Sequence, residues 1–128
     1  MTFEFIEFET LRKSDHDGPP RPTRKVITNA VELKNFYDLL DSERDIPLPS
    51  VDFETDMVVA VARGECLTEG YSVRIEDIIR YDGRLIAVVC ETDPEEGVLQ
   101  TCCYPYHLIR TQKCDGIEFG DYLKKTDF

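Results

Sequence analysis

The residues best suited to chemistry are the cysteines and histidines, of which the chain has five and two. Cys102, Cys103 and His107 lie within one short segment, and their types resemble part of a zinc site. In a strand, Cys103 and His107 would share a face but lie roughly 13 Å apart, at about 3.3 Å per residue. Zinc holds its ligands within about 2.3 Å of the metal. We therefore expect no metal at these residues.

Thiol catalysis is the second chemistry that these residues suggest. A reactive thiol needs a lowered pKa, which comes from nearby cations or a helix N-terminus. Cys66 instead lies between Glu65 and Glu69, whose negative charges favour the protonated thiol. A cysteine brought next to His107 by the fold stays open as an alternative, a thiol-dependent enzyme or redox protein. Its cysteine would be one of Cys66, Cys102, Cys103 and Cys114.

Other catalytic patterns are missing from the sequence. There is no Gly-x-Ser-x-Gly elbow of the kind that presents a nucleophilic serine. Asp93, Glu95 and Glu96 share one loop, but they lack the alternating ligand spacing of a calcium loop. We therefore expect a protein that is not an enzyme and uses no cofactor.

Composition narrows the classes of partner. Lys and Arg number 15 and Asp and Glu number 26, which gives a formal net charge of −11. Such a balance opposes binding to nucleic acid and to anionic membranes, since both draw affinity from basic residues. No segment approaches the ~20 apolar residues that span a bilayer. The start lacks the pattern of a signal peptide, and an odd number of cysteines fits free thiols, so we expect a cytoplasmic protein.

The elements that must position these residues can be read from periodicity. A length of 128 residues suits a single domain, residues 1–128. Alternating apolar and acidic residues predict a strand over residues 3–11. A helix is predicted over about residues 30–44, because Asn29 can cap it and Glu32 completes the capping pattern. Apolar residues recur at helical spacing along it: Leu33, Phe36, Tyr37 and Leu40, with Leu39 widening the stripe.

The second half of the chain has the period of strands. Residues 57–63, 71–81 and 84–92 are predicted to form one contiguous antiparallel sheet, with a tight turn at Asp82-Gly83. A further strand bent at Pro105 and a short strand near residues 116–119 follow. The fold class is therefore α+β, a mostly antiparallel curved sheet or half-barrel of about six or seven strands with one helix.

The stretch GECLTEGYSVRI, from Gly64 to Ile75, connects two of these strands. Gly64 and Gly70 are expected to shape the connection, because glycine accepts positive φ without a Cβ clash. Tyr71 is expected to anchor it with a ring largely buried in the core. Three residues would be left at an exposed tip as a candidate partner-binding loop: Glu65, Leu67 and Glu69.

These residues also carry a resemblance to a known family. The segment PSVDFETDMVVAVARGECLTEGYSVRIEDI and the later PEEG and YPYHLIRT resemble the PrcB C-terminal domain, over roughly residues 26–120. Glu69 replaces the usual first glycine of the family's Thr-Gly-Gly-Tyr. The matching positions are Val51, Asp52, Phe53, Gly64, Thr68, Gly70, Tyr71, Tyr104, Pro105 and Tyr106.

The resemblance implies a bacterial, non-catalytic accessory or protein-binding module, with a protease as partner in the case that names the family. It implies no catalytic residues. Members are commonly exported or anchored, which differs from the cytoplasmic location expected here. A small-ligand-binding domain, with the concave face of the sheet as its pocket, is the second alternative. The sequence leaves the oligomeric state open.

Overall fold

The computed structural model describes residues 2–40 and 46–122. Strands make up most of the regular structure, with one helix in the described part. In chain order the elements are β1 (Phe3–Phe5), β2 (Phe8–Ser14), β3 (Pro22–Ile27), α1 (Ala30–Asp38), β4 (Asp56–Arg63), β5 (Ser72–Tyr81), β6 (Arg84–Thr92), β7 (Tyr106–Gln112) and β8 (Glu118–Asp121).

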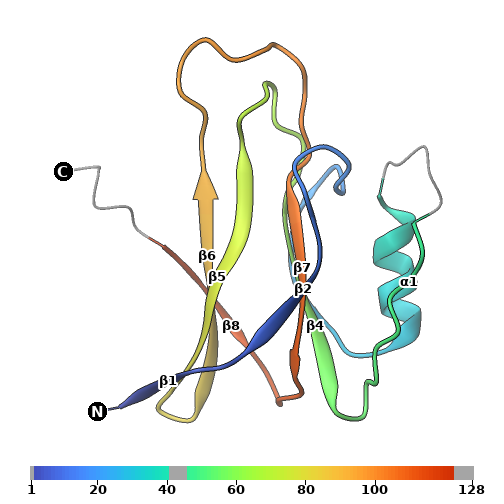
Figure 1. Ribbon diagram of the computed structural model, residues 1–128, viewed down its shortest axis with the longest axis vertical. Coiled ribbons are helices and arrows are strands. Elements are labelled where there is room, and N and C mark those ends of the chain that lie inside the picture. The colour runs from blue at the N-terminus through green and yellow to red at the C-terminus, as the bar shows by residue number, and fades with distance from the viewer. Residues whose placement is uncertain (1, 41–45, 123–128) are drawn as a thin grey trace.

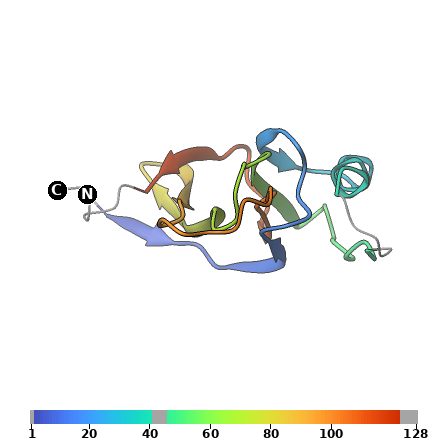
Figure 2. The ribbon, with the colours of Figure 1, turned by 90° about the horizontal axis from the view of Figure 1, so that it is seen from above.

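The strands form two sheets that face one another. Sheet A has the strand order β1-β5-β6-β8, and sheet B has the order β2-β7-β4-β3. All strand pairs are antiparallel except β6 with β8. The helix lies beside sheet B, on the side away from sheet A, so the molecule has three layers (Figures 1 and 2). The predicted α+β class, mostly antiparallel with one helix, is confirmed, but the strands form two sheets that do not close into a barrel.

Strand β4 explains the layering. It lies between β7 and β3, and its interior residues are buried on both faces. Met57, Val59 and Val61 point into the core between the sheets, while Val58 and its alternating neighbours point toward the helix. This is the period of two expected of a central strand covered on both sides.

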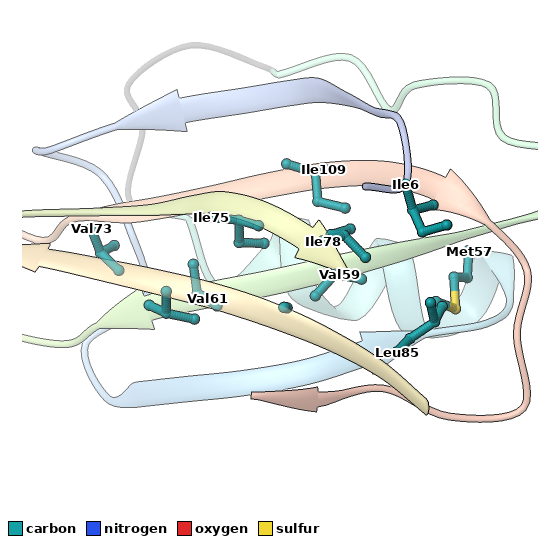
Figure 3. Close-up of a cluster of buried hydrophobic side chains, with 11 residues drawn as sticks. Ile6, Met57, Val59, Val61, Val73, Ile75, Ile78, Leu85 and Ile109 are labelled. Carbon is teal, nitrogen blue, oxygen red and sulfur yellow. The ribbon is translucent and has the colours of Figure 1, made fainter. Parts of the chain in front are cut away.

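The core between the sheets is apolar and continuous (Figure 3). Sheet A contributes Val73, Ile75 and Leu85, which meet Val59 and Ile109 of sheet B. Aliphatic side chains therefore fill the inner faces of the two sheets. The alternative of a small-ligand-binding domain places its pocket on the concave face of the sheet.

The prediction of one contiguous sheet over residues 57–92 is wrong. Strands β5 and β6 pair along their length, but β4 pairs with β3 and β7 in the other sheet. The 64–71 connection therefore carries the chain from sheet B to sheet A. The alternation of residues shows which side chains share a face of a strand, but not which strands pair with one another. The change of sheet therefore could not be predicted from the alternation.

The predicted strand over residues 3–11 is likewise two strands. The chain leaves sheet A after β1 and enters sheet B at β2. Ile6 lies at the crossing, buried in the core, and its backbone N–H donates to the Ile78 carbonyl at 2.8 Å. Ile6 thus lies where the chain changes from one sheet to the other.

The helix begins as predicted and ends earlier. The Asn29 side chain accepts a hydrogen bond from the Glu32 N–H at 2.9 Å, which caps the first turn. The helix ends at Asp38 with Leu39 as C-cap, so Leu39 does not widen the apolar stripe and is exposed instead. The remainder of the predicted helix, residues 41–44, lies outside the described residues.

Two later expectations concern turns. The Asp82-Gly83 hairpin is confirmed, since both residues have positive φ, 52° and 73°. The strand expected to bend at Pro105 begins only at Tyr106, after an irregular segment. Among the described residues, no helix is both long and apolar enough to cross a membrane.

Candidate functional site

Two connections meet at one end of the molecule, residues 64–71 between β4 and β5 and residues 93–105 between β6 and β7 (Figure 1). Cys66 and Cys103 exchange both backbone hydrogen bonds, each at 2.9 Å. The Glu69 N–H donates to the Leu99 carbonyl at 3.1 Å. Because backbone hydrogen bonds join them, we treat these connections as one surface, called the loop pair.

Two glycines set the path of the first connection. Gly64 and Gly70 have φ of 79° and 96°, the positive values that the sequence predicts. A Cβ on Gly64 would lie 2.7 Å from the ring of Pro22, and one on Gly70 would lie 2.5 Å from Cβ of Pro94. Both positions therefore exclude larger residues on conformational and steric grounds.

Arg63 joins the two sheets beneath this connection. Its guanidinium donates to the Thr92 carbonyl at 3.0 Å and forms ion pairs with Glu91 at 3.1 Å and Asp93 at 2.9 Å. It also lies over the Tyr71 ring, 4.9 Å from the centroid. The side chain is only 16% exposed, so its charge needs partners within the protein. The two carboxylates and the aromatic face supply them.

Tyr71 differs from the sequence expectation. Tyr71 is partly buried, but it is not among the residues of either core. It precedes β5 rather than beginning its inward face, which starts at Val73. The ring covers Arg63 instead of filling the core.

A shallow groove runs beside Arg63 and Tyr71. Its walls come from β3, β4, β6 and the first connection, and include Arg24, Cys66, Leu67 and Glu91. Arg24 and Glu91 form an ion pair at 3.3 Å across it. The groove therefore contains charges of both signs that already have partners.

The predicted partner-binding residues occupy the outer side of the loop pair. Glu65 and Leu67 are exposed, Leu67 at 76%, and Glu69 is half-buried. The Tyr104 hydroxyl donates to Glu65 at 3.3 Å. Leu99, on the second connection, is 67% exposed.

Two residues of this region were missed by sequence reasoning. Leu99 follows the acidic run of residues 93–96. An apolar residue in such a polar connection is a signal of a candidate contact surface. Arg63 ends an apolar strand directly before Gly64, and a cation at such a position indicates that acceptors lie nearby.

The fold does not make His107 available as a base for a cysteine. His107 is 4% exposed, and its Nδ1 accepts a hydrogen bond from the Ile75 N–H at 2.9 Å. The proton therefore lies on Nε2, which is 2.8 Å from Thr10 Oγ1 and donates to it. Burial, with smaller contributions from Lys13 and Arg74, lowers the pKa of His107 to about 4. Both ring nitrogens thus join β7 to β5 and β2.

The cysteines are dispersed except for one pair. Cys66 faces Cys103, Cys90 is buried in β6, Cys102 is exposed, and Cys114 packs against the inner core. Desolvation and the neighbouring Cys103 raise the pKa of Cys66, while desolvation and Glu65 raise the pKa of Cys102. These thiols are therefore protonated near neutral pH, the state least suited to nucleophilic attack. Within residues 2–40 and 46–122, no three His, Cys, Asp or Glu side chains gather closely enough to hold a metal ion.

Comparison with known proteins gives one match. Residues 57–112 match the family model described as PrcB C-terminal. The matched segment begins in β4 and ends with β7, so it contains both connections of the loop pair. The resemblance drawn from the sequence is confirmed over this segment. No curated protein and no solved structure matches the chain.

Proposed function

We propose that this chain, with its PrcB C-terminal segment, is a non-enzymatic accessory module that binds another protein through the loop pair. One observation carries the proposal: Leu67 and Leu99 are both highly exposed on connections that backbone hydrogen bonds hold together. Exposed leucines on a held backbone offer apolar area to a partner with little ordering cost. A flexible loop would lose more conformational entropy on binding.

The charges around the leucines favour a particular type of partner. Acidic residues surround the two leucines in the sequence of both connections, among them Glu65, Glu69, Asp93, Glu95 and Glu96. Exposed leucines on connections rich in carboxylates complement a surface with apolar residues and Lys or Arg near them. The family is named for a subunit of a protease complex, so a protease is the partner that we propose. The five free cysteines favour a reducing compartment, and we propose that the two proteins meet in the cytoplasm.

The chemistry of the described residues supports a binding role over thiol catalysis. His107 uses both ring nitrogens inside the fold, and its lowered pKa keeps it neutral. Cys66 and Cys102 have raised pKa values. A thiol nucleophile would need the opposite shifts and a free imidazole.

Site-specific photo-cross-linking tests the proposal. A photoreactive residue at position 67 or 99 should cross-link one protein from extracts of the source cells. The same residue at Val31, which is 70% exposed on the helix, is the matched control and should not capture that protein. Equal capture from position 31 would contradict the assignment to the loop pair.

A binding measurement with the captured protein completes the test. Leu67→Asp should raise Kd by at least about tenfold, equivalent to about 1.4 kcal/mol. Val31→Asp should leave Kd unchanged. Replacing Glu65, Leu67 and Glu69 together by alanine should change stability by less than about 1 kcal/mol, as surface substitutions do. An unchanged Kd for Leu67→Asp would refute the proposal.

A further inference from the structure

Cys66 and Cys103 face one another across the two connections. They form an isolated antiparallel bridge in which each N–H donates to the other's carbonyl at 2.9 Å. In such a hydrogen-bonded pair the Cα atoms lie about 5.5 Å apart and both side chains stand on the same face. That separation falls within the range of about 4.4–6.8 Å found for disulfides. The Cα spacing of such a pair is therefore compatible with a cross-link.

Each thiol donates to a backbone carbonyl of the first connection. The Cys103 thiol donates to the Thr68 carbonyl at 3.1 Å, and the Cys66 thiol donates to the Gly64 carbonyl at 3.8 Å. The neighbouring Cys103 thiol also contributes to the raised pKa of Cys66. Opposite Cβ atoms in a hydrogen-bonded pair lie up to about 5.5 Å apart, and those of a disulfide about 3.5–4.5 Å. Rotation about the side-chain bonds, together with a small local shift of the backbone, would bring the sulfurs together.

Accessibility distinguishes the two cysteines. Cys66 is half-buried and borders the groove, whereas Cys103 is fully buried. A small oxidant in the groove would therefore meet Cys66 first. Cys103 is then placed to react within the molecule, which is the arrangement of a first and a resolving thiol.

We propose that Cys66 and Cys103 are an oxidative modification site, where a small disulfide such as oxidised glutathione produces a reversible disulfide bond. At alkaline pH, where a larger share of Cys66 is deprotonated in spite of its raised pKa, the Cys66 thiolate attacks one sulfur of oxidised glutathione, and one glutathione thiolate leaves. The Cys103 thiolate then attacks the Cys66 sulfur, and the second glutathione leaves. The two cysteines lose two electrons and two protons, and oxidised glutathione becomes two molecules of glutathione.

The bond would fix the loop pair covalently. The first connection would be tied to the second at a point between Gly64 and Gly70, in place of the two backbone hydrogen bonds alone. This inference does not depend on whether the loop pair binds a partner.

Thiol counting and peptide mapping test the site. The reduced protein should have five titratable thiols after unfolding, and incubation with oxidised glutathione at pH 8.5 should consume two of them in an intramolecular disulfide, with any glutathione adduct on the exposed Cys102 counted separately by its added mass. Peptide mapping should show the Cys66–Cys103 link, and reduction should restore all five thiols. The reaction should speed up as the pH rises, because the thiolate is the attacking species.

Matched variants make the outcome decisive. Cys66→Ser and Cys103→Ser should each abolish the intramolecular link, while Cys90→Ser should retain it. The oxidised wild-type protein should unfold at a higher temperature than the reduced one, since a cross-link restricts the unfolded chain. A link involving Cys102 or Cys114, a stable glutathione adduct on Cys66, or a lower unfolding temperature on oxidation would each overturn the proposal.

Discussion

At the scale of single residues, His107 joins the two sheets through a side-chain hydrogen bond. It belongs to β7 of sheet B, yet its Nδ1 accepts the Ile75 N–H of sheet A, directly beside the register shift between Ile75 and Asp77. A bulge leaves a backbone donor without a strand partner, and the imidazole supplies the acceptor. The interaction requires the neutral ring.

Protonation of His107 should therefore destabilise the fold. Its pKa is about 4 in the folded protein, below its ordinary value of 6.5. Between these values the unfolded chain binds a proton that the native protein does not, so stability should fall as the pH falls from 6.5 toward 4. The full difference is on the order of 3 kcal/mol. Urea unfolding at intervals from pH 7.5 to pH 4.5 would measure it.

His107→Gln is the control for this prediction, because glutamine does not titrate. The variant should be less stable at pH 7.5 but should lose less of its remaining stability between pH 6.5 and 5. Lys13 and Arg74, the charged residues that also lower the pKa of His107, stay in place in this variant. Equal pH dependence in the two proteins would show that another group is responsible.

At the scale of elements, the connection from β4 to β5 depends on glycine. Gly64→Ala should cost about 3 kcal/mol or more, since it adds a left-handed non-glycine residue and a clash with Pro22. Gly97→Ala is the matched control, because Gly97 also has positive φ but open space around it. It should cost only about 1–2 kcal/mol.

Urea unfolding of both glycine variants would measure the difference. Equal costs would mean that the contact with Pro22 relaxes freely and that backbone conformation alone decides the effect.

Local signals in the sequence predicted elements well, and pairing between distant elements poorly. The Asn29 cap, the Asp82-Gly83 turn and the two-sided burial of β4 each follow from residues within one short window. The assignment of β4 and β5 to different sheets depends on β3 and β7, which lie far away in the chain. The helix was predicted too long because Leu39 and Leu40 continue the apolar spacing past the point where the helix ends.

The candidate site shows the same division. The positive φ of Gly64 and Gly70 and the exposure of Leu67 could be predicted from residue type and position. The contact of Arg63 with Tyr71 could not, because the position of Arg63 also depends on Glu91 of β6 and Asp93 of the second connection. The pairing of Cys66 with Cys103 likewise needs the three-dimensional fold.

At the scale of the whole molecule, β4 belongs to both cores. Its two faces pack against sheet A on one side and against α1 on the other. Neither core can therefore lose its packing while the other keeps an intact β4. Arg63 and His107 add polar links between the same sheets.

The described part of the chain should consequently unfold in a single transition. Differential scanning calorimetry should give a calorimetric enthalpy equal to the van't Hoff enthalpy, a ratio of about 1. Near- and far-ultraviolet circular dichroism should show coincident melting curves. A ratio well above one, or separate curves, would mean that the helix layer melts apart from the sheets.

The pairing of β2 with β7 also has a consequence for how the protein is made. β2 ends at Ser14 and its partner begins at Tyr106. During translation, roughly 90 further residues must be synthesised after β2 before β7 appears. At the ordinary rate of the ribosome this takes about 5–20 s. β4 would emerge in the same interval with apolar residues on both faces and only β3 beside it. A nascent chain of this topology remains open until β7 has been synthesised, and β4 is the segment that a ribosome-associated chaperone would have to protect.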